Sequence, residues 1–574
     1  MDNPTAASPW RLAGYALATL LAVFTYFYGL DSQHIPKNGD EYPYAHITRL
    51  TAASGHLLPL QSQLQDMRNT KPPLLFWQGI ASTAWGQQWT LWHLRYPSVI
   101  YTLLTACLTF LLGWKLSGKK LETGFIALLT YLAFFSTYRY GRPFLVNPAE
   151  TFWFLLPFFI LLYWQPAAFA SRFLVPLLLG IVVGVGLLYK SFALVAPVGL
   201  ALAWWYLHLR NYRVREFMLR DAAKVTFTLA LALALFSLWF VLDPDPQAIW
   251  REFIVGENVG KFDPHGGGYL AKFLWGGSSV WALLLGYPMN AGLLAFPVVA
   301  LAYVAFRRRR QMDDAEQLLW IAMFAFFIVF SLPSQRSSRY LLEAMPFLAV
   351  LCALNWQRIH RAFFALSLLL AGALIGAIAF LSVHLQQEVG GVTLYTSSYW
   401  ALLATAGIIT ALALLLGSLT RPLVNVSIVL VFLVFAAFLR PFDGALGNYT
   451  AAVQRYVQGK EVWVPCNFRA KDEGYRFILP GAQVHGYHED AALNAATLAE
   501  KYPLFALQVA LHDVGCVDCR IIGQRLDIRS RQSKDEIRQM LKGEVFSHLF
   551  AKELLIEPQN TGRKPQVQLE EGCR

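Results

Sequence analysis

Long apolar runs separated by short polar segments make up the first 440 residues of the chain. The hydrocarbon core of a bilayer is about 30 Å thick, and about 20 helical residues cross it. Runs that reach or approach this length lie near residues 11–30, 92–114, 121–138, 148–164, 173–189, 192–209, 225–242, 279–306, 316–332, 340–355, 362–383, 398–417 and 422–439. The pattern predicts a mainly α-helical, polytopic membrane protein with about 13 transmembrane helices.

The composition agrees with a membrane location. Hydrophobic residues make up 56% of the chain and charged residues 15%, whereas a soluble protein is about a quarter charged. The net charge is +12, but the basic residues fall mainly in short loops between the apolar runs, so no nucleic-acid partner is expected. The sequence has no Walker loop, Rossmann fingerprint or Gly-x-Ser-x-Gly elbow, so nucleotide-dependent chemistry has no support.

Loop charge predicts the orientation in the membrane. If the N-terminus is cytoplasmic, every inner loop carries Lys or Arg, as the positive-inside rule requires. These residues are Lys115, Lys119, Lys120, Arg172, Arg210, Arg213, Arg215, Arg220, Lys224, Arg307 to Arg310, Arg358, Arg361 and Arg421. We expect a multi-pass protein of the bacterial inner (plasma) membrane, with a cytoplasmic N-terminus and a periplasmic C-terminal domain.

The composition changes after Arg440. Strand-like runs such as EVWVPC alternate there with helix-like runs such as SKDEIRQMLKGEV, which is typical of a small α/β domain. We predict a transmembrane domain over 1–440 and a periplasmic α/β domain over 441–574. An outer location allows disulfides, with the pairing left open, among Cys466, Cys516, Cys519 and Cys573.

Two outer loops are longer than simple connectors. Residues 31–91 are expected to hold juxtamembrane helices, including one near 45–58 and a short interfacial or re-entrant one after Lys71. Residues 243–278 contain Gly266 to Gly268, which favours a loop able to close over a ligand, with an ordinary flexible loop as the alternative.

Two adjacent carboxylates, Asp40 and Glu41, follow the first apolar run. An acidic pair beside a membrane span attracts cations, and a carboxylate can act as a general base on a hydroxyl group. The alternative is the start of a solvated loop. Several basic residues stand close to the apolar runs on the same outer face, against the charge rule: Lys71, Arg139, Arg142, Lys190, Arg336 and Arg339. Each alone is typical of a snorkelling side chain, but together they predict an anionic ligand, and phosphate suits them best.

These parts predict group transfer from a lipid-linked phosphate at the outer surface, with the carboxylate as base and the cations stabilising the leaving phosphate. The competing hypothesis is a lipid-linked-sugar flippase or transporter, which about 13 spans would also suit. Transporters show paired repeats and ionisable groups near the midplane, and this sequence has no apparent repeat. A third hypothesis, a non-catalytic scaffold with a periplasmic binding domain, leaves the outer cations unused.

Four landmarks resemble the membrane glycosyltransferases of the GT-C class that take sugars from polyprenyl phosphates. They are Asp40-Glu41, Lys71-Pro72-Pro73-Leu74, the stretch GRPFLVNPAE, and Arg336 with SSRYLLEAMP. GLLYKS with Lys190 and the loop ENVGKFDPHGGG are further similarities. Over most of the chain the layout is similar to that of protein O-mannosyltransferases and of the aminoarabinose transferases that modify lipid A.

The resemblance implies an inverting transfer of a sugar from a polyprenyl-phosphate carrier to an acceptor on the periplasmic side. That acceptor would be lipid A, another glycolipid or polysaccharide, or a protein. Asp40 would be the catalytic carboxylate, with Glu41 supporting it or exchanging roles. Lys71 would bind the carrier phosphate, and the further candidates for donor or acceptor phosphates are Arg142, Lys190, Arg336 and Arg339.

Supporting candidates are Arg139, Asn147 and Glu150. Pro43, Thr70 and Asn147 stand where the aminoarabinose transferases carry Arg, Glu and Asp, and Glu150 could supply a carboxylate in place of the last of these. These residues identify no cofactor with certainty. A divalent cation is left open, with His265 as a candidate contact.

Overall fold

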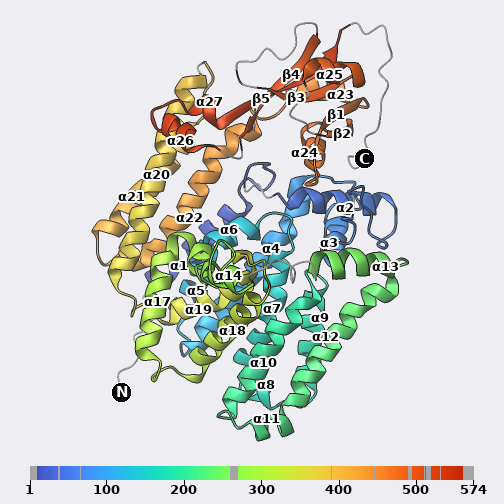
Figure 1. Cartoon of the computed structure of the whole chain (residues 1–574). Coiled ribbons are helices and arrows are strands. Elements are labelled where there is room, and N and C mark those ends of the chain that lie inside the picture. Colours follow the sequence, from blue (N-terminus) through green and yellow to red (C-terminus); the bar gives the residue numbers. More distant parts are fainter. Residues whose placement is uncertain are drawn as a thin grey trace.

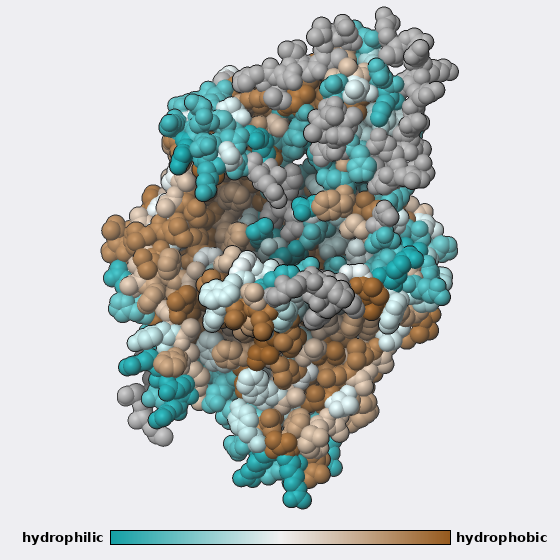
Figure 2. Space-filling view, in the orientation of Figure 1, coloured by the Kyte–Doolittle hydropathy of each residue, from teal (hydrophilic) through white to brown (hydrophobic). Residues whose placement is uncertain are grey.

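The computed structural model describes residues 9–35, 39–64, 66–258, 269–389, 391–444, 446–488, 494–509, 511, 519–529 and 532–559. The protein is a bundle of long helices with one small sheet at one end of it (Figure 1). Apolar surface covers much of the long helices, while polar surface gathers around the sheet and at the opposite end (Figure 2). This distribution confirms the predicted mainly α-helical membrane fold with a small C-terminal sheet.

Nine helical segments among the described residues are long and apolar enough to cross a membrane. They are α1 (Pro9–Phe27), α4 (Leu91–Leu116), η1 with α10 (Phe192–Leu209), α12 (Ala222–Leu242), α15 to α17 (Val280–Arg308), α18 (Asp314–Ser331), α20 (Arg361–Val389), α21 (Ser397–Leu415) and α22 with η6 (Thr420–Asp443). A further pair, α5 (Leu121–Ala133) and α6 (Phe135–Gly141), is bent by 63°.

The other three predicted runs form shorter helices. These are α7 (Asn147–Tyr163), α9 (Leu174–Leu187) and the 3-10 helix η5 (Ser338–Ala344), which continues into α19 (Met345–Leu354). Length and composition alone therefore do not establish them as spans, and the number 13 stays a prediction.

Short helices occupy the connecting segments. The first long loop holds α2 (Glu41–Ala53) and α3 (Leu74–Ser82), close to the helices predicted there. The others are α8 (Ala167–Ala170), α11 (Val214–Arg220), α13 (Pro246–Ile249), the π-helix η2 (Trp250–Asn258) and α14 (Tyr269–Leu274). His265 and Gly266 to Gly268 lie outside the described residues.

A separate apolar cluster holds α2 in place. Ile47 of α2, Leu75 of α3, and Phe144 and Val146 just before α7 are all buried in it. Because burial of such side chains contributes about 1.5–3 kcal/mol each, α2 is tied to the end of the helix bundle that faces the sheet (Figure 1). The residue at its N-cap, Asp40, is therefore held at this end.

The C-terminal part forms a five-stranded sheet in the order β2-β1-β3-β5-β4. β1 (Glu461–Cys466) pairs in parallel with β2 (Gln483–His488) and β3 (Phe505–Val509), while β5 (Phe550–Pro558) is antiparallel to β3 and β4 (Cys519–Ile528). The helices of this part are α23 (Ala451–Val457), α24 (Lys471–Ile478), α25 (Ala495–Lys501), α26 (Lys534–Leu541) and α27 (Val545–Leu549). Cys466 and Cys519 each take part in a disulfide bond.

Among the residues that the structure describes, hydrogen bonds to two carboxylates help to anchor the C-terminal part to the helix bundle. Buried Glu473 of α24 accepts hydrogen bonds from Arg49 of α2, with an Nε–Oε1 distance of 2.8 Å. At the second place, the Glu388 carboxylate near the end of α20 accepts from the backbone N–H groups of Val545 and Phe546, at the start of α27. One anchor thus lies on the helix that begins beside Asp40.

Candidate active site

Asp40 and Arg339 form the exposed edge of a polar network. Asp40 is the N-cap residue of α2, and Arg339 belongs to η5, about 300 residues later. Arg339 Nη1 donates to Asp40 Oδ2 at 2.6 Å, and its Nη2 donates to Asn147 Oδ1 at 3.1 Å. The Asp40 side chain is 44% exposed and that of Arg339 30%, so this pair is accessible to a substrate.

The network continues inward along α7. Asn147 and Glu150 lie one helical turn apart, so their side chains share a face. Asn147 Nδ2 donates to Glu150 Oε2 at 3.1 Å, and Lys190 Nζ donates to the same oxygen at 2.7 Å. Both α7 residues are buried. Five residues predicted from four separate stretches therefore lie in one hydrogen-bonded chain: Asp40, Arg339, Asn147, Glu150 and Lys190.

Lys71 lies in a second group of charges. Its Nζ donates to Glu257 Oε1 at 2.6 Å and to the Thr70 carbonyl at 2.8 Å. Burial lowers the pKa of the Lys71 ammonium, and the nearby Glu257 carboxylate only partly offsets that effect. Asn69 N also donates to Glu252 Oε2 at 2.9 Å. The segment before α3 and the π-helix η2 are thus joined around Lys71.

Tyr44 marks the region where the two groups meet. Its ring is buried, and burial together with the charge of Asp40 raises the pKa of its hydroxyl, so that this group stays protonated. Arg339, Lys190 and Glu257 also act electrostatically on this hydroxyl. The Asp40 network and the Lys71 pair therefore border one polar region. Tyr44 and Glu257 were not predicted, although Tyr44 lies in the stretch that follows Asp40.

Glu41, the neighbour of Asp40, points into the protein. Its carboxylate forms a bidentate ion pair with Arg95, in which both N–O distances are 2.6 Å and both side chains are almost fully buried. Glu41 Oε1 also accepts from the backbone N–H of Phe144 at 2.8 Å. This arrangement anchors the first turn of α2, which positions Asp40.

Two of the predicted cations brace the backbone. Arg142 is fully buried, and its Nε donates to the Tyr26 carbonyl at the end of α1 at 2.9 Å. Arg336 is also buried and donates to the carbonyls of Ser331 and Ser278 at 2.6 and 2.7 Å. Because these guanidinium groups donate to backbone carbonyls, both arginines connect interhelical segments to helix ends in this structure.

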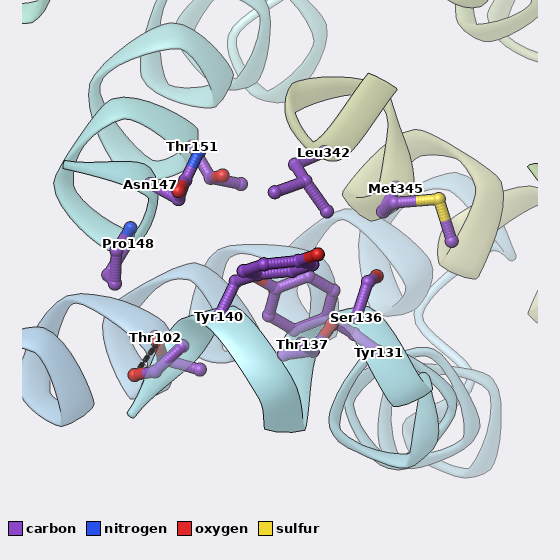
Figure 3. A pocket seen from close by; sticks show the side chains of 11 residues that line it. Thr102, Tyr131, Ser136, Thr137, Tyr140, Asn147, Pro148, Thr151, Leu342 and Met345 are labelled. Atoms are coloured by element: carbon purple, nitrogen blue, oxygen red, sulfur yellow. Dashed lines mark hydrogen bonds between the residues drawn. The ribbon is translucent and has the colours of Figure 1, made fainter. Parts of the chain in front are cut away.

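A small cavity lies beside the network, between α4, α6, α7 and η5. Figure 3 shows Tyr140 of α6, Asn147 and Thr151 of α7, and Leu342 of η5 around it. The Arg339 guanidinium lies 5.0 Å from the centroid of the Tyr140 ring, and that of Arg139 lies 5.2 Å from it. The cavity of about 20 Å³ can hold about one water molecule.

Among the described residues, one group of side chains has the spacing of a metal site. Ligand atoms of His46, Asp472 and Glu473 lie within 4.8 Å of one another. However, Arg49 donates to both carboxylate oxygens of Glu473, and His46 Nε2 accepts from the Gln63 N–H at 3.1 Å. An arginine in contact with the carboxylate repels a cation. The group is therefore better described as a buried ion-pair cluster between α2 and α24.

Comparison with known proteins supports the predicted class. The family model described as dolichyl-phosphate-mannose-protein mannosyltransferase matches residues 17–250, a segment that contains Asp40, Lys71 and Glu150. The undecaprenyl phosphate-alpha-4-amino-4-deoxy-L-arabinose arabinosyl transferase 2 of Proteus mirabilis is 26% identical over 403 residues, which are 68% of each chain. The corresponding transferase of Edwardsiella ictaluri is 27% identical over 363 residues, which are 61% of this chain and 60% of the relative.

The fold is similar to that of ArnT from Cupriavidus metallidurans. The alignment with its apo structure has a TM-score of 0.60 at 16% sequence identity and covers 94% of this chain and 97% of the ArnT chain. The alignment with the ArnT structure bound to undecaprenyl phosphate has a TM-score of 0.59 at 16% sequence identity and covers 96% of this chain and 98% of the ArnT chain. The resemblance predicted from the sequence motifs is confirmed. Together these findings support a membrane glycosyltransferase of the GT-C class.

Proposed function

We propose that this protein transfers a sugar from a polyprenyl-phosphate carrier to an acceptor at the periplasmic face of the bacterial inner membrane. Relatives named as undecaprenyl-phosphate-dependent arabinosyl transferases support the donor class. The observation that carries the proposal is the accessible Asp40–Arg339 pair, bordered by a network that reaches Lys190 and by the buried Lys71 ammonium. A base and phosphate-binding cations are the groups that such a transfer needs.

In this mechanism Asp40 is the general base. The acceptor hydroxyl gives its proton to Asp40 while its oxygen forms a bond to the anomeric carbon of the sugar. Arg339 holds the carboxylate through the 2.6 Å hydrogen bond, and Asn147 holds Arg339. Attack from the side opposite the phosphate inverts the anomeric centre.

The bond between the anomeric carbon and the phosphate oxygen breaks in the same step. Its electron pair stays on the polyprenyl phosphate, which gains negative charge. Lys71 is best placed to stabilise this charge, because it is a buried cation, and buried charges interact more strongly than exposed ones. Lys190 lies within electrostatic range of Lys71 and adds to the positive potential.

The other predicted residues receive positioning roles in this proposal. Glu41 anchors α2 through Arg95, while Arg142 and Arg336 brace the outer loops. Arg139 is exposed beside Tyr140 and stays a candidate contact for an acceptor phosphate.

The location and the domain division are also proposals. Disulfide-bonded Cys466 and Cys519 favour an oxidising compartment for residues 441–574, in agreement with the loop charges of residues 1–440. A requirement for a divalent cation is tested by assaying transfer after treatment with a chelator.

Replacing Asp40 with Asn tests the base directly. Because general-base catalysis contributes about 10²–10⁴-fold, we expect Asp40→Asn to lower transfer at least 100-fold while binding of undecaprenyl phosphate is kept. Asp31→Asn is a matched control, since Asp31 is another exposed outer carboxylate paired with an arginine, Arg440, at 3.0 Å. Mass spectrometry of the lipids measures transfer, and normal transfer by Asp40→Asn would refute the assignment. A flippase would move the carrier without changing its mass.

A further inference from the structure

Glu343 is a buried carboxyl group with no role in the mechanism above. It lies in η5, four residues after Arg339, and is 1% exposed. Within the described part of the chain, neither oxygen of Glu343 has a hydrogen-bond donor, and neither does Glu150 Oε1. Buried carboxylates without donors are costly, at several kcal/mol each, so this arrangement requires a physical explanation.

The groups that face Glu343 suggest that it holds a proton. Glu150 faces it from α7, Lys190 from the segment before η1, and Tyr287 from α16. Burial disfavours the ionised form of the Glu343 carboxyl, and the negative charge of Glu150 disfavours it further, while the Lys190 ammonium favours it. Two ionised carboxylates offer only acceptors to each other, so their contact becomes a hydrogen bond when one of them is protonated.

Charge balance leads to the same conclusion. With Glu343 protonated, the negative charges of Asp40 and Glu150 are matched by the positive charges of Arg339 and Lys190. If Glu343 were ionised, the buried end of the network would carry one uncompensated negative charge. Such a charge would attract the Lys190 ammonium away from Glu150 and loosen the acceptor that holds the Asn147 amide.

We infer that Glu343 is a positioning residue: protonated, it donates to Glu150 and thereby holds the chain Glu150, Asn147 and Arg339 in the geometry that presents Asp40 to the acceptor. The orientation of the Asn147 amide is the central link. Its NH2 group faces the Glu150 carboxylate and its carbonyl oxygen faces Arg339, an order that requires Glu150 to remain an acceptor. This inference rests on the proposed function, because it assigns Glu343 to the same site.

Two substitutions of Glu343 test whether this residue acts as a protonated hydrogen-bond donor or as an ionised carboxylate. Glu343→Gln keeps an N–H donor toward Glu150, whereas Glu343→Leu keeps the volume and removes the donor. We expect Glu343→Gln to retain the wild-type kcat, and Glu343→Leu to lower kcat by about 10- to 100-fold, since a small misplacement of catalytic groups has effects of that size. KM for the carrier should stay unchanged in both, because Lys71 belongs to the other group of charges.

The pH profile gives a second readout. When the pH rises far enough to ionise Glu343, the wild-type carboxyl loses its proton and kcat should fall. Glu343→Gln cannot lose this proton, so its kcat should stay constant over that range. Equal losses of kcat in the Gln and Leu variants would overturn the inference, and so would full activity in both.

Infrared spectroscopy tests the proton without relying on activity. The wild-type protein should show the carbonyl band of a buried protonated carboxylic acid at neutral pH, and Glu343→Gln should lack it. Glu536→Gln is the control, because the pKa of Glu536 is lowered to about 2 and this group is already ionised. A band that persists in Glu343→Gln would overturn the inference. If even the wild-type protein transfers no sugar, the proposed function fails, while this band still decides the protonation of Glu343.

Discussion

Glu257 is paired with Lys71, the cation that binds the carrier phosphate in the proposed mechanism. Its carboxylate lies 2.6 Å from Lys71 Nζ, in the position that a phosphate oxygen would take to bind this ammonium. A carrier phosphate must therefore displace Glu257 or share Lys71 with it. Replacing Glu257 with Gln removes the negative charge and keeps the side-chain size, so we expect the carrier to bind more tightly.

The size of this effect follows from the exposure of the pair. The Lys71 side chain is 11% exposed and that of Glu257 34%. Fully exposed ion pairs contribute about 0.2–1 kcal/mol, and hydrogen bonds to charged groups contribute about 1.5–3 kcal/mol. A partly exposed pair should lie between these two ranges, at about 1 kcal/mol. Since 1.4 kcal/mol is a factor of ten in affinity, the Kd for undecaprenyl phosphate should fall about fivefold.

The assay is binding of undecaprenyl phosphate to the purified protein in detergent, compared with Glu252→Gln. Glu252 lies in the same π-helix and accepts from Asn69 instead of Lys71, so this control weakens the same loop contact and leaves the Lys71 pair intact. Tighter binding in Glu257→Gln alone supports competition for Lys71. Unchanged or weaker binding in Glu257→Gln would refute the reasoning.

A change in pH dependence should accompany this substitution. Glu257 raises the pKa of Lys71 against the larger lowering effect of burial, so its removal lowers that pKa further. Lys71 binds phosphate only while it is protonated. Binding by Glu257→Gln should therefore be lost at a lower alkaline pH than binding by the wild-type protein.

Two further predictions concern stability. Glu41→Gln leaves the Arg95 guanidinium buried without its countercharge, which destabilises by about 3–5 kcal/mol, and thermal unfolding in detergent should show a lower Tm. For Glu473, burial alone would raise the pKa, but the hydrogen bond from His46 and the charge of Arg49 hold it at about 2, below its usual 4.5. Its stabilisation is thus complete above about pH 4.5 and is lost as the pH falls toward 2, so the drop in Tm over this range should be smaller in Glu473→Gln.

Part of the site could be predicted from the sequence. The charged residue types are visible there, and the order of the apolar runs predicts on which side of the membrane each residue lies. Asp40, Lys190 and Arg339 each stand next to an apolar run on the predicted outer face, and a membrane protein brings such positions to one surface. That logic does not distinguish Arg339 from Arg142. The difference arises because Arg142 is surrounded by backbone carbonyls of another helix end, a contact that only the packed fold determines.

Glu343 and Glu257 show a different limit. Both lie in stretches noted as landmarks, yet neither has a local pattern that identifies its partner. For Glu343, a signal existed: a lone carboxylate within the apolar stretch RYLLEAMPFL is expensive beside a membrane and for that reason points to function. For Glu257, the partner Lys71 is 186 residues away, and no spacing rule connects the two.

The ion pair between Arg49 and Glu473 bears on how the chain can be divided. Cutting near residue 440, at the predicted domain boundary, would remove the partner of Arg49 on the same helix whose N-cap is Asp40. It would also uncover Glu388 at the end of α20. A truncated protein, or a chimaera with the soluble part of another transferase, would need matching carboxylates at both places. We therefore expect the C-terminal part to be exchangeable between transferases only together with the residues of the helix bundle that contact it, including those of α2.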